Sequence, residues 1–285
     1  GLTREAIHAL DSRDPRKPFF LYMAHYAVHI PINKDKRYYQ KYLDKGMDPI
    51  EAAYAGLIEG MDKSLGDLMN YLEENKLTDN TIIIFMSDNG GLSAAGTGRG
   101  GEANTHNLPL KSGKGSAYEG GIREPMIVLW PGTTKKESVC EDYLIIEDFY
   151  PTILEMAQVK RVKTVQPVDG KSFIPLLTGK GKNPSLNRAL YWNTPNNWGP
   201  TGPGIAATCA IRQGDWKLIY YYETGAKELF NLKDDLGEAT NLALTNPEKV
   251  NELSGKLGKF LRKSGGQRPS FKATGKPAPW PDETF

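Results

Sequence analysis

The strongest constraint on the fold is one short run of β-branched and other apolar residues. Thr81–Met86 reads TIIIFM and stops at Ser-Asp-Asn-Gly-Gly, residues 87–91. An unbroken run of this kind is typical of a strand that is covered on both faces, as in a parallel sheet between helices. Asparagine and glycine directly after it indicate a turn. The run therefore predicts an α/β architecture with a polar turn at the end of a central strand.

Strand and helix patterns alternate on either side of this run. Phe19–Ala24 and Met126–Trp130 are further apolar runs, and each predicts a buried strand. Residues 50–76 carry apolar side chains at the helical spacing, and residues 145–158 also predict a helix. This order of strands and helices predicts a layered α/β domain with a largely parallel sheet.

The pattern changes after about residue 185. Short strand-like stretches joined by turns follow, and then one amphipathic helix and a proline-rich tail over residues 265–285. The four expected strands are Leu190–Trp192, Thr208–Arg212, Trp216–Tyr222 and Glu228–Leu232, and the expected helix is Glu248–Leu261. We expect residues 1–185 to form the larger α/β domain and residues 186–285 a smaller α+β subdomain with an antiparallel sheet and an extended tail.

Composition excludes several classes of function. The 36 Lys and Arg residues against 34 Asp and Glu residues leave a net charge of +2, which is not the clustered basic excess expected for nucleic-acid binding. No run of about 18 apolar residues occurs, so we expect no membrane span. Cys140 and Cys209 fit no zinc or redox spacing. The pattern sets no oligomeric state.

Asp88 and Asn89 are the first candidate site residues. They follow a predicted buried strand, and ligands gather at the carboxyl ends of strands in open α/β sheets. A carboxylate beside a carboxamide offers hard oxygen ligands for Ca²⁺, or for Mg²⁺ as the alternative. Asp-Asn-Gly is also ordinary turn chemistry, so a plain turn is the competing interpretation.

Two further candidates carry positive charge or a titratable ring. His29 follows the first predicted strand, and a surface histidine is the alternative interpretation. His25 suits a packed histidine, and His106 lies in a long glycine-rich loop whose role is open. Lys114 lies between two glycines, which let the backbone approach an anion that the ammonium neutralises; Lys111 lies close by, and a solvated loop lysine is the competing interpretation.

Residues beyond 190 offer a surface for sugars. Trp198 and Asn197 lie in an Asn-Asn-Trp-Gly-Pro loop, where an aromatic face and an amide could contact sugar rings and hydroxyls. Core packing is the commoner role for Trp192 and Trp216. In the glycine-rich segment, Glu119, Arg123 and Glu124 suit a structural set of salt bridges rather than catalysis.

Taken in order, these segments resemble the type I sulfatases of the alkaline phosphatase superfamily, and the resemblance covers nearly the whole chain. The polysaccharide-degrading sulfatases of gut and marine bacteria are the most similar kind. The segments that carry the resemblance are Phe19–Tyr22 with His29-Ile-Pro31, Ser87-Asp88-Asn89-Gly-Gly, Gly113-Lys114-Gly, Tyr118-Glu-Gly-Gly-Ile-Arg123-Glu-Pro, Asp169-Gly170-Lys-Ser172, Leu-Leu-Thr-Gly, and Arg212-x-Gly-Asp-Trp216-Lys-Leu.

The resemblance implies a fold and a set of roles. The fold would be part of an alkaline phosphatase-like α/β/α sandwich with the smaller carboxy-terminal subdomain. Asp88 and Asn89 match the second half of the family's Ca²⁺ site. His29 matches a histidine that contacts sulfate and can protonate the leaving oxygen, and Lys114 matches the lysine between sulfate and leaving group. We also expect His106, Lys111, Asn197 and Trp198 to contact substrate, a sulfated carbohydrate or an aryl sulfate ester.

The chain departs from the family pattern at the nucleophile. Sulfatases use a formylglycine made from Cys or Ser in a Cys/Ser-x-Pro/Ala-x-Arg motif, and neither Cys140 nor Cys209 lies in one. The early Asp-Asp metal pair is missing too. We therefore expect the chain to be the carboxy-terminal portion of a sulfatase, with formylglycine upstream, and to be inactive alone.

Two other hypotheses stay open from the sequence. The chain could be a binding remnant that keeps a pocket for sulfate and glycan without catalysis, or part of a phosphate or phosphonate monoester hydrolase of the same superfamily. A periplasmic or secreted location is an expectation from the family alone. The sugar and the position of its sulfate are not readable.

Overall fold

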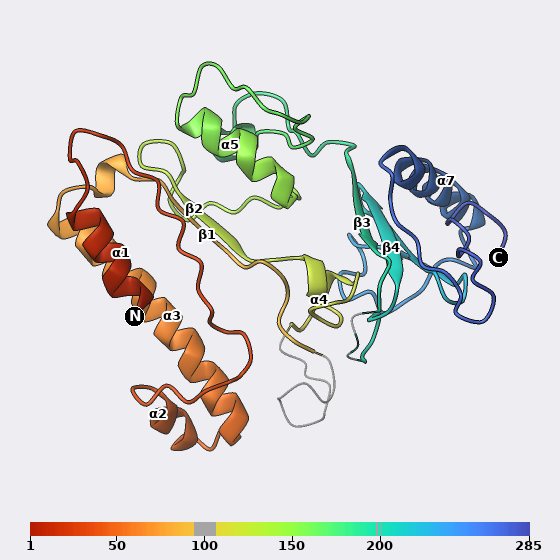
Figure 1. Ribbon diagram of the computed structural model, residues 1–285, viewed down its shortest axis with the longest axis horizontal. Coiled ribbons are helices and arrows are strands. Elements are labelled where there is room, and N and C mark those ends of the chain that lie inside the picture. The colour runs from red at the N-terminus through yellow and green to blue at the C-terminus, as the bar shows by residue number, and fades with distance from the viewer. Residues whose placement is uncertain (94–106, 198, 200) are drawn as a thin grey trace. The chain divides into compact units, whose positions relative to one another are not determined.

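The computed structural model describes residues 1–93, 107–197, 199 and 201–285 (Figure 1). The chain divides into two compact units. The first contains residues 1–83 and 129–132, and the second contains the described residues from 84 to 128 and from 133 to 285.

The first unit is mainly helical. It contains α1 (Leu2–Asp11), α2 (Tyr39–Leu43), α3 (Pro49–Glu74) and a short 3-10 turn (Thr78–Asn80). The long helix confirms the prediction for residues 50–76. Its first turn is capped by Asp48, whose Oδ1 accepts a hydrogen bond of 2.8 Å from the Ile50 amide. Ala6 and Leu10 of α1 pack against Leu68, Tyr71 and Leu72 of α3, which joins the two helices through one apolar face.

The predicted strand at Phe19–Ala24 is wrong. Residues 18–26 form no strand or helix, and they find no ladder partner in the described part of the chain. Phe20 and Tyr22 are 73% and 81% exposed. A strand needs hydrogen bonds from a neighbour, and an apolar run cannot supply them by itself.

β1 (Ile83–Met86) and β2 (Met126–Leu129) confirm two predicted strands and pair as a two-stranded sheet. Their burial is lower than expected, since β1 is half-buried throughout and Ile127 of β2 is 66% exposed. The larger, mainly parallel sheet predicted from the sequence is not present among the described residues. An apolar run predicts a strand, but the layers that would cover it depend on other segments.

Short helices follow in the second unit: α4 (Glu119–Ile122), a 3-10 turn (Ile146–Asp148), α5 (Phe149–Met156) and α6 (Ile174–Thr178). The helix predicted for residues 145–158 is confirmed in its central part. Asp148 is fully buried at its start, where its carboxylate accepts hydrogen bonds from the Lys171 amide and from Nη1 of Arg188, each 2.8 Å long. Buried charge is tolerated here because it is paired and hydrogen-bonded.

The carboxyl-terminal part forms a four-stranded antiparallel sheet, as the sequence predicts, and the structure sets its strand order as β3–β4–β5–β6. The strands are β3 (Ala189–Thr194), β4 (Thr208–Gln213), β5 (Trp216–Tyr221) and β6 (Lys227–Asn231), followed by α7 (Pro247–Lys263). Leu253 and Leu257 of α7 are buried with Ile211 and Leu218 of the sheet. This sheet and α7 are called the carboxyl-terminal body below. The tail forms one isolated bridge, between Ser270 and Pro277.

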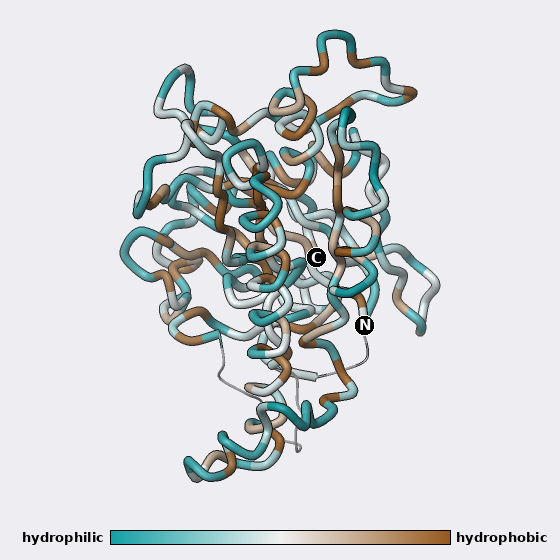
Figure 2. The backbone as a smooth tube through the Cα atoms, turned by 90° about the vertical axis from the view of Figure 1, so that its left-hand side faces the viewer, coloured by the Kyte–Doolittle hydropathy of each residue, from teal (hydrophilic) through white to brown (hydrophobic). Residues whose placement is uncertain are grey.

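Hydropathy along the backbone agrees with this architecture. Figure 2 shows short hydrophobic stretches separated by hydrophilic ones rather than one long apolar segment. Within the described ranges, none of the helices has the length and apolar character needed to cross a membrane.

Candidate active site

The turn that carries Asp88 and Asn89 begins directly after β1. Asp88 is exposed and Asn89 is half-buried. Ser87 donates a 2.9 Å hydrogen bond from Oγ to the Asn89 carbonyl, and Nδ2 of Asn89 donates to the Gly90 carbonyl over 3.1 Å. Because the amide nitrogen is held by the backbone, the Asn89 amide has a set orientation beside the Asp88 carboxylate.

Two backbone hydrogen bonds join this turn to the glycine-rich segment that carries Lys114. The Gly90 amide donates to the Gly121 carbonyl over 3.2 Å, and the Lys114 amide donates to the Gly91 carbonyl over 3.0 Å. A Cβ atom on Gly90 would lie 1.8 Å from a backbone oxygen of the neighbouring segment, so only glycine allows this approach. The structure therefore brings Asp88, Asn89 and Lys114 into one part of the second unit.

Asn107 completes this junction, although sequence reasoning did not single it out. Its Oδ1 accepts from the Gly91 amide over 3.0 Å, and its Nδ2 donates to the Gly91 and Ser112 carbonyls over 3.0 and 2.9 Å. A single asparagine thus bridges the two segments with three hydrogen bonds. One asparagine in a loop gives no periodic signal, so its role follows only from the tertiary structure.

Glu124 supplies an observation that bears on cation binding. Burial, and then the negative charge of Asp88, raise the pKa of Glu124 to about 7. Its Oε1 is buried and has no hydrogen-bond partner in the structure as described. Two carboxylates that lie close enough to affect each other's pKa repel each other when both are charged. A divalent cation bound near them would offset this repulsion.

The donor set for such an ion is partial. Asp88 and Asn89 fit two of the six to eight oxygen ligands that Ca²⁺ takes. Among the described residues, no group of three or more His, Cys, Asp or Glu side chains is placed to hold a metal. The described residues at this turn therefore offer two oxygen ligands for such an ion and do not complete a site.

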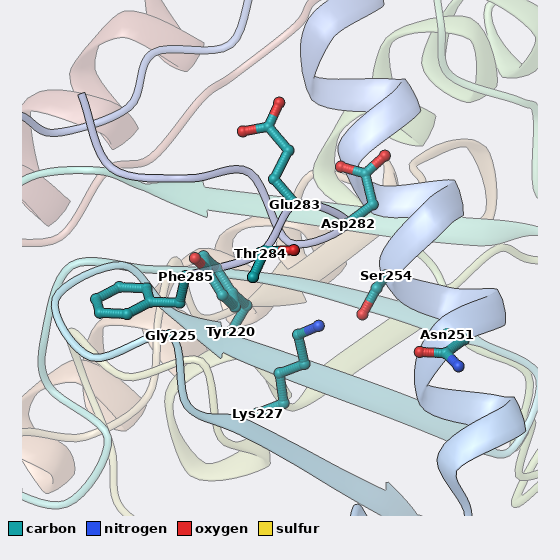
Figure 3. Close-up of a pocket in the computed structure, with 9 residues that line it drawn as sticks. All are labelled: Tyr220, Gly225, Lys227, Asn251, Ser254, Asp282, Glu283, Thr284 and Phe285. Carbon is teal, nitrogen blue, oxygen red and sulfur yellow. The ribbon is translucent and has the colours of Figure 1, made fainter. Parts of the chain in front are cut away.

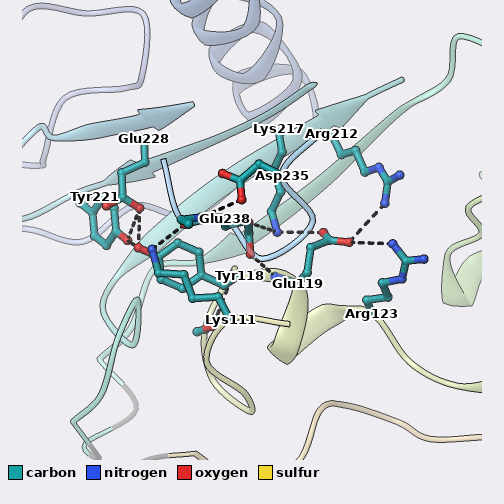
Figure 4. A network of polar contacts seen from close by, with 12 residues as sticks. Lys111, Tyr118, Glu119, Arg123, Arg212, Lys217, Tyr221, Glu228, Asp235 and Glu238 are labelled. Atoms are coloured by element: carbon teal, nitrogen blue, oxygen red, sulfur yellow. Dashed lines mark hydrogen bonds and ion pairs between the residues drawn. The ribbon is translucent and has the colours of Figure 1, made fainter. Parts of the chain in front are cut away.

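The predicted structural role of Glu119 and Arg123 is confirmed. Glu119 is 1% exposed, and its carboxylate lies 3.7 Å from Arg123, 3.4 Å from Arg212 and 3.0 Å from Lys217 (Figure 4). Glu124, grouped with them from the sequence, is not among the residues paired with Glu119 here, and its pKa is influenced by the charge of Asp88 instead. Charge complementarity thus holds α4 against β4 and β5.

Lys111 is engaged within the protein. Its Nζ donates a 2.9 Å hydrogen bond to the Glu238 carbonyl and lies 4.1 Å from the centre of the Tyr118 ring. These contacts give Lys111 a role in holding its own segment, and its contact with substrate stays a prediction.

The histidines lie in the first unit or outside the described residues. His29 is exposed in the first unit, and its Nδ1 lies 2.8 Å from the Ile30 carbonyl. His25 is half-buried, and burial lowers its pKa. His106 lies outside the described residues. The structure therefore joins Asp88, Asn89 and Lys114, while His29 belongs to the other unit.

The predicted sugar-facing residues are described only in part. Trp198 lies outside the described residues. Asn197 is exposed, and its Oδ1 accepts a 2.9 Å hydrogen bond from the Gly199 amide. Trp192 and Trp216 pack against the two apolar clusters of the sheet, which supports the core-packing interpretation for both.

A separate cavity of about 520 Å³ lies beside α7 in the carboxyl-terminal body (Figure 3). Lys227 and Ser254 line it, together with the last four residues of the chain. Its lining includes no residue of the candidate active site.

Comparison with known proteins places this geometry in a family. The sequence profile of the family described as Sulfatase matches residues 2–159, and that described as N-sulphoglucosamine sulphohydrolase, C-terminal, matches residues 113–266. The fold matches that of a sulfatase-type protein. The chain belongs to the sulfatase family, within the alkaline phosphatase superfamily.

Individual relatives agree with this assignment. A sulfatase of Formosa agariphila is 35% identical over 86% of this chain and 46% of its own length. An N-acetylgalactosamine-6-O-sulfatase of Bacteroides thetaiotaomicron is 30% identical over 84% of this chain and 46% of its own length. The crystal structure of Ps i-CgsB in complex with k-i-k-neocarrahexaose superposes with a TM-score of 0.78, at 28% identity, over 95% of this chain and 55% of that one.

The matches cover most of this chain but only part of each relative. The chain spans about half the length of the curated relatives that it matches. The family and its fold are therefore established for this half, and the activity of a whole protein is a separate question.

Proposed function

We propose that the whole protein is a sulfuric ester hydrolase that removes sulfate from a sulfated carbohydrate, and that this chain carries part of its active site. The observation that carries the proposal is the junction of the Asp88–Asn89 turn with the Lys114 segment through paired glycines and Asn107. Within a chain of the sulfatase family, these are the residues expected at the metal and at the sulfate.

Each residue has a chemical task in this proposal. Asp88 and Asn89 would hold Ca²⁺, which when bound offsets negative charge on the sulfuryl oxygens. Lys114 would place positive charge beside the oxygen that leaves as an alkoxide, and that charge lowers the barrier. His29 would donate a proton to the same oxygen. The nucleophile is proposed to be a formylglycine outside residues 1–285.

The substrate class rests on the relatives. One relative is named for N-acetylgalactosamine 6-O-sulfate, and one solved structure is described with a neocarrahexaose. Sulfated carbohydrate is therefore the class that we propose for this protein, together with the periplasmic or secreted location where such polymers are degraded. Which sugar it accepts is left to the assay.

The test is sulfate release by the whole protein from N-acetylgalactosamine 6-sulfate, from a sulfated galactan and from an aryl sulfate. We expect Lys114→Ala to lower kcat by about 10²–10³-fold, with a smaller change in KM, because the charge acts mainly as the leaving oxygen gains charge. Lys233→Ala, at an exposed lysine of the same unit, is the matched control and should keep full activity.

Two results would contradict the proposal. If the whole protein binds these sulfated compounds without releasing sulfate, it is a binding protein rather than a hydrolase. If it releases phosphate from phosphate monoesters faster than sulfate from sulfate esters, the substrate class is wrong.

A further inference from the structure

A fully buried lysine of the carboxyl-terminal body lies between two buried carboxylates, one from α4 and one from the loop between β6 and α7. Lys217 of β5 is 0% exposed, and its Nζ lies 3.0 Å from Oε1 of Glu119 and 2.9 Å from Oε1 of Glu238 (Figure 4). Removing one partner of such a set leaves an uncompensated buried charge. By pairing with both carboxylates, the Lys217 ammonium links the segments that contain Glu119 and Glu238, which are about 120 residues apart in the sequence.

Glu238 contacts the glycine-rich segment at two points. Its Oε2 accepts a 2.6 Å hydrogen bond from the Glu119 amide, at the start of α4. Its backbone carbonyl accepts the 2.9 Å hydrogen bond from Nζ of Lys111. Lys114 lies between Lys111 and Glu119 in the sequence. Glu238, in the loop between β6 and α7, thus contacts both ends of the segment that carries the candidate sulfate-binding lysine.

The glycine-rich segment that carries Lys114 and α4 also contacts the proposed metal-binding turn, residues 87–91. Gly121, at the end of α4, accepts from the Gly90 amide, and Lys114 donates to Gly91. A Cβ atom on Gly120 would lie 2.4 Å from the Lys111 carbonyl, and one on Gly113 would lie 2.1 Å from the Gly91 carbonyl. Backbone packed this closely has little room to adjust, so a shift of α4 must move the residues on both sides of it.

We propose that Lys217 and Glu238 are positioning residues for the active site: they hold α4 and residues 111–119 so that Lys114 keeps its place beside the Asp88–Asn89 turn. The catalytic importance of that place rests on the proposed function. The alternative is that the buried ion pairs contribute only to the overall stability of the carboxyl-terminal body.

The experiment is amide hydrogen exchange on the intact chain and its Lys217→Met variant. Methionine keeps the length and apolar character of the lysine stem and removes the charge. We expect protection at the Gly90 and Lys114 amides to fall at least about tenfold more than at the Leu257 amide of α7, because the junction opens locally. An equal fall at all three amides would overturn the proposal, since it would reflect global stability alone.

Two further variants keep the test decisive. Glu238→Gln retains an acceptor for the Glu119 amide but removes one charge, and it should give the same local pattern to a smaller degree; if Lys217→Met does not fold, this variant decides. Lys256→Met removes a lysine from an exposed ion pair on α7. It should leave the exchange protection of the Gly90 and Lys114 amides unchanged. Protection at Gly90 and Lys114 that stays equal to the wild type in Glu238→Gln would also overturn the proposal.

Kinetics of the whole protein then separate the two proposals. We expect Lys217→Met to lower kcat at least about tenfold under conditions where the protein remains folded. If the wild-type protein releases no sulfate, the proposed function fails, while the exchange experiment still decides whether Lys217 and Glu238 position the segment. If hydrogen exchange changes at Gly90 and Lys114 but kcat does not, Lys217 and Glu238 hold the segment without affecting catalysis. The proposal that they position the active site is then wrong.

Discussion

The carboxyl-terminal body and the β1–β2 region differ in how their apolar side chains are covered. In the body, Leu218 and Leu257 are 0% exposed between the sheet and α7. In the β1–β2 region, Ile127 is 66% exposed and β1 is only half-buried. Two strands alone make a marginal sheet, whereas four strands with a packed helix carry a core. The body is therefore covered by its own residues, while the β1–β2 sheet lacks comparable cover within the described residues.

The comparison also holds for charged side chains. Lys217 of the body is buried with Glu119 of α4 and with Glu238, and its ammonium pairs with both carboxylates. Beside β2, Glu124 has a buried oxygen without a hydrogen-bond partner in the described part of the chain. The charge of a buried carboxylate beside a buried ammonium is compensated, whereas a carboxylate without such a neighbour keeps a charge that pH or a cation can change.

The largest expected effect comes from truncating the core of the body. Leu257→Ala should lower the free energy of unfolding by about 2–5 kcal/mol, because it removes a fully buried side chain and leaves a cavity. Ile127→Ala, at the exposed strand, is the matched variant and should change it by less than about 0.5 kcal/mol. Urea unfolding followed by far-UV circular dichroism measures both. Equal losses of unfolding free energy in the two variants would show that the β1–β2 region is packed as well as the carboxyl-terminal body.

A smaller effect should depend on pH at Glu124. Its pKa is raised to about 7 in the folded chain from the ordinary value of 4.5. The folded state then keeps a proton that the unfolded state has lost, so stability falls as the pH rises from about 4.5 through 7. Glu124→Gln removes the titration and should be more stable than wild type by about 1–3 kcal/mol at pH 8, with little difference at pH 4.

The Glu124 measurement uses thermal unfolding in a chelator, so that no cation compensates the carboxylate. Glu141→Gln, at an exposed glutamate, is the control and should show no such dependence. A difference between Glu124→Gln and wild type that is the same at both pH values would show that the carboxylate is already compensated.

The smallest effect is expected at an exposed carboxylate of α7. Hydrogen bonds from Lys249 and then Lys256 lower the pKa of Glu252 to about 2, so its contribution is present above about pH 4.5 and is lost as the pH falls toward 2. Because the side chain is 42% exposed, solvent screens the pair, and Glu252→Gln should cost only a few tenths of a kcal/mol at pH 7. Chemical unfolding at low and high salt checks this, since a loss that persists at high salt would contradict a screened surface pair.

Much of the local structure follows from the sequence. The β-branched run before Asp88, the helical spacing of residues 50–76 and the four short strands after residue 185 each match an observed element. Their periodicity is a local property, so no distant contact is needed to recognise it. Phe19–Ala24 shows the limit, because an apolar run without a ladder partner forms no strand.

The sequence predicted the main residues of the candidate site but not the contacts that hold them in place. The sequence indicated Asp88, Asn89 and Lys114 by their place after a strand and between glycines. It did not indicate Asn107, Glu238 or Lys217, which act through contacts with residues far along the chain. Lys217 lies in a strand whose four central residues are all buried, and nothing in the sequence of that strand indicates that two carboxylates will meet the lysine.

The sequence by itself thus determined the family, the strands and helices with strong periodicity, and the residue types offered at the end of β1. Only the tertiary structure decided which segments touch: the glycine-to-glycine contact between residues 90–91 and 113–121, and the ion pairs that hold α4 to β5. The physical reason is that periodicity reports which face of an element is apolar, whereas close backbone approach and charge pairing depend on partners brought together by the whole fold.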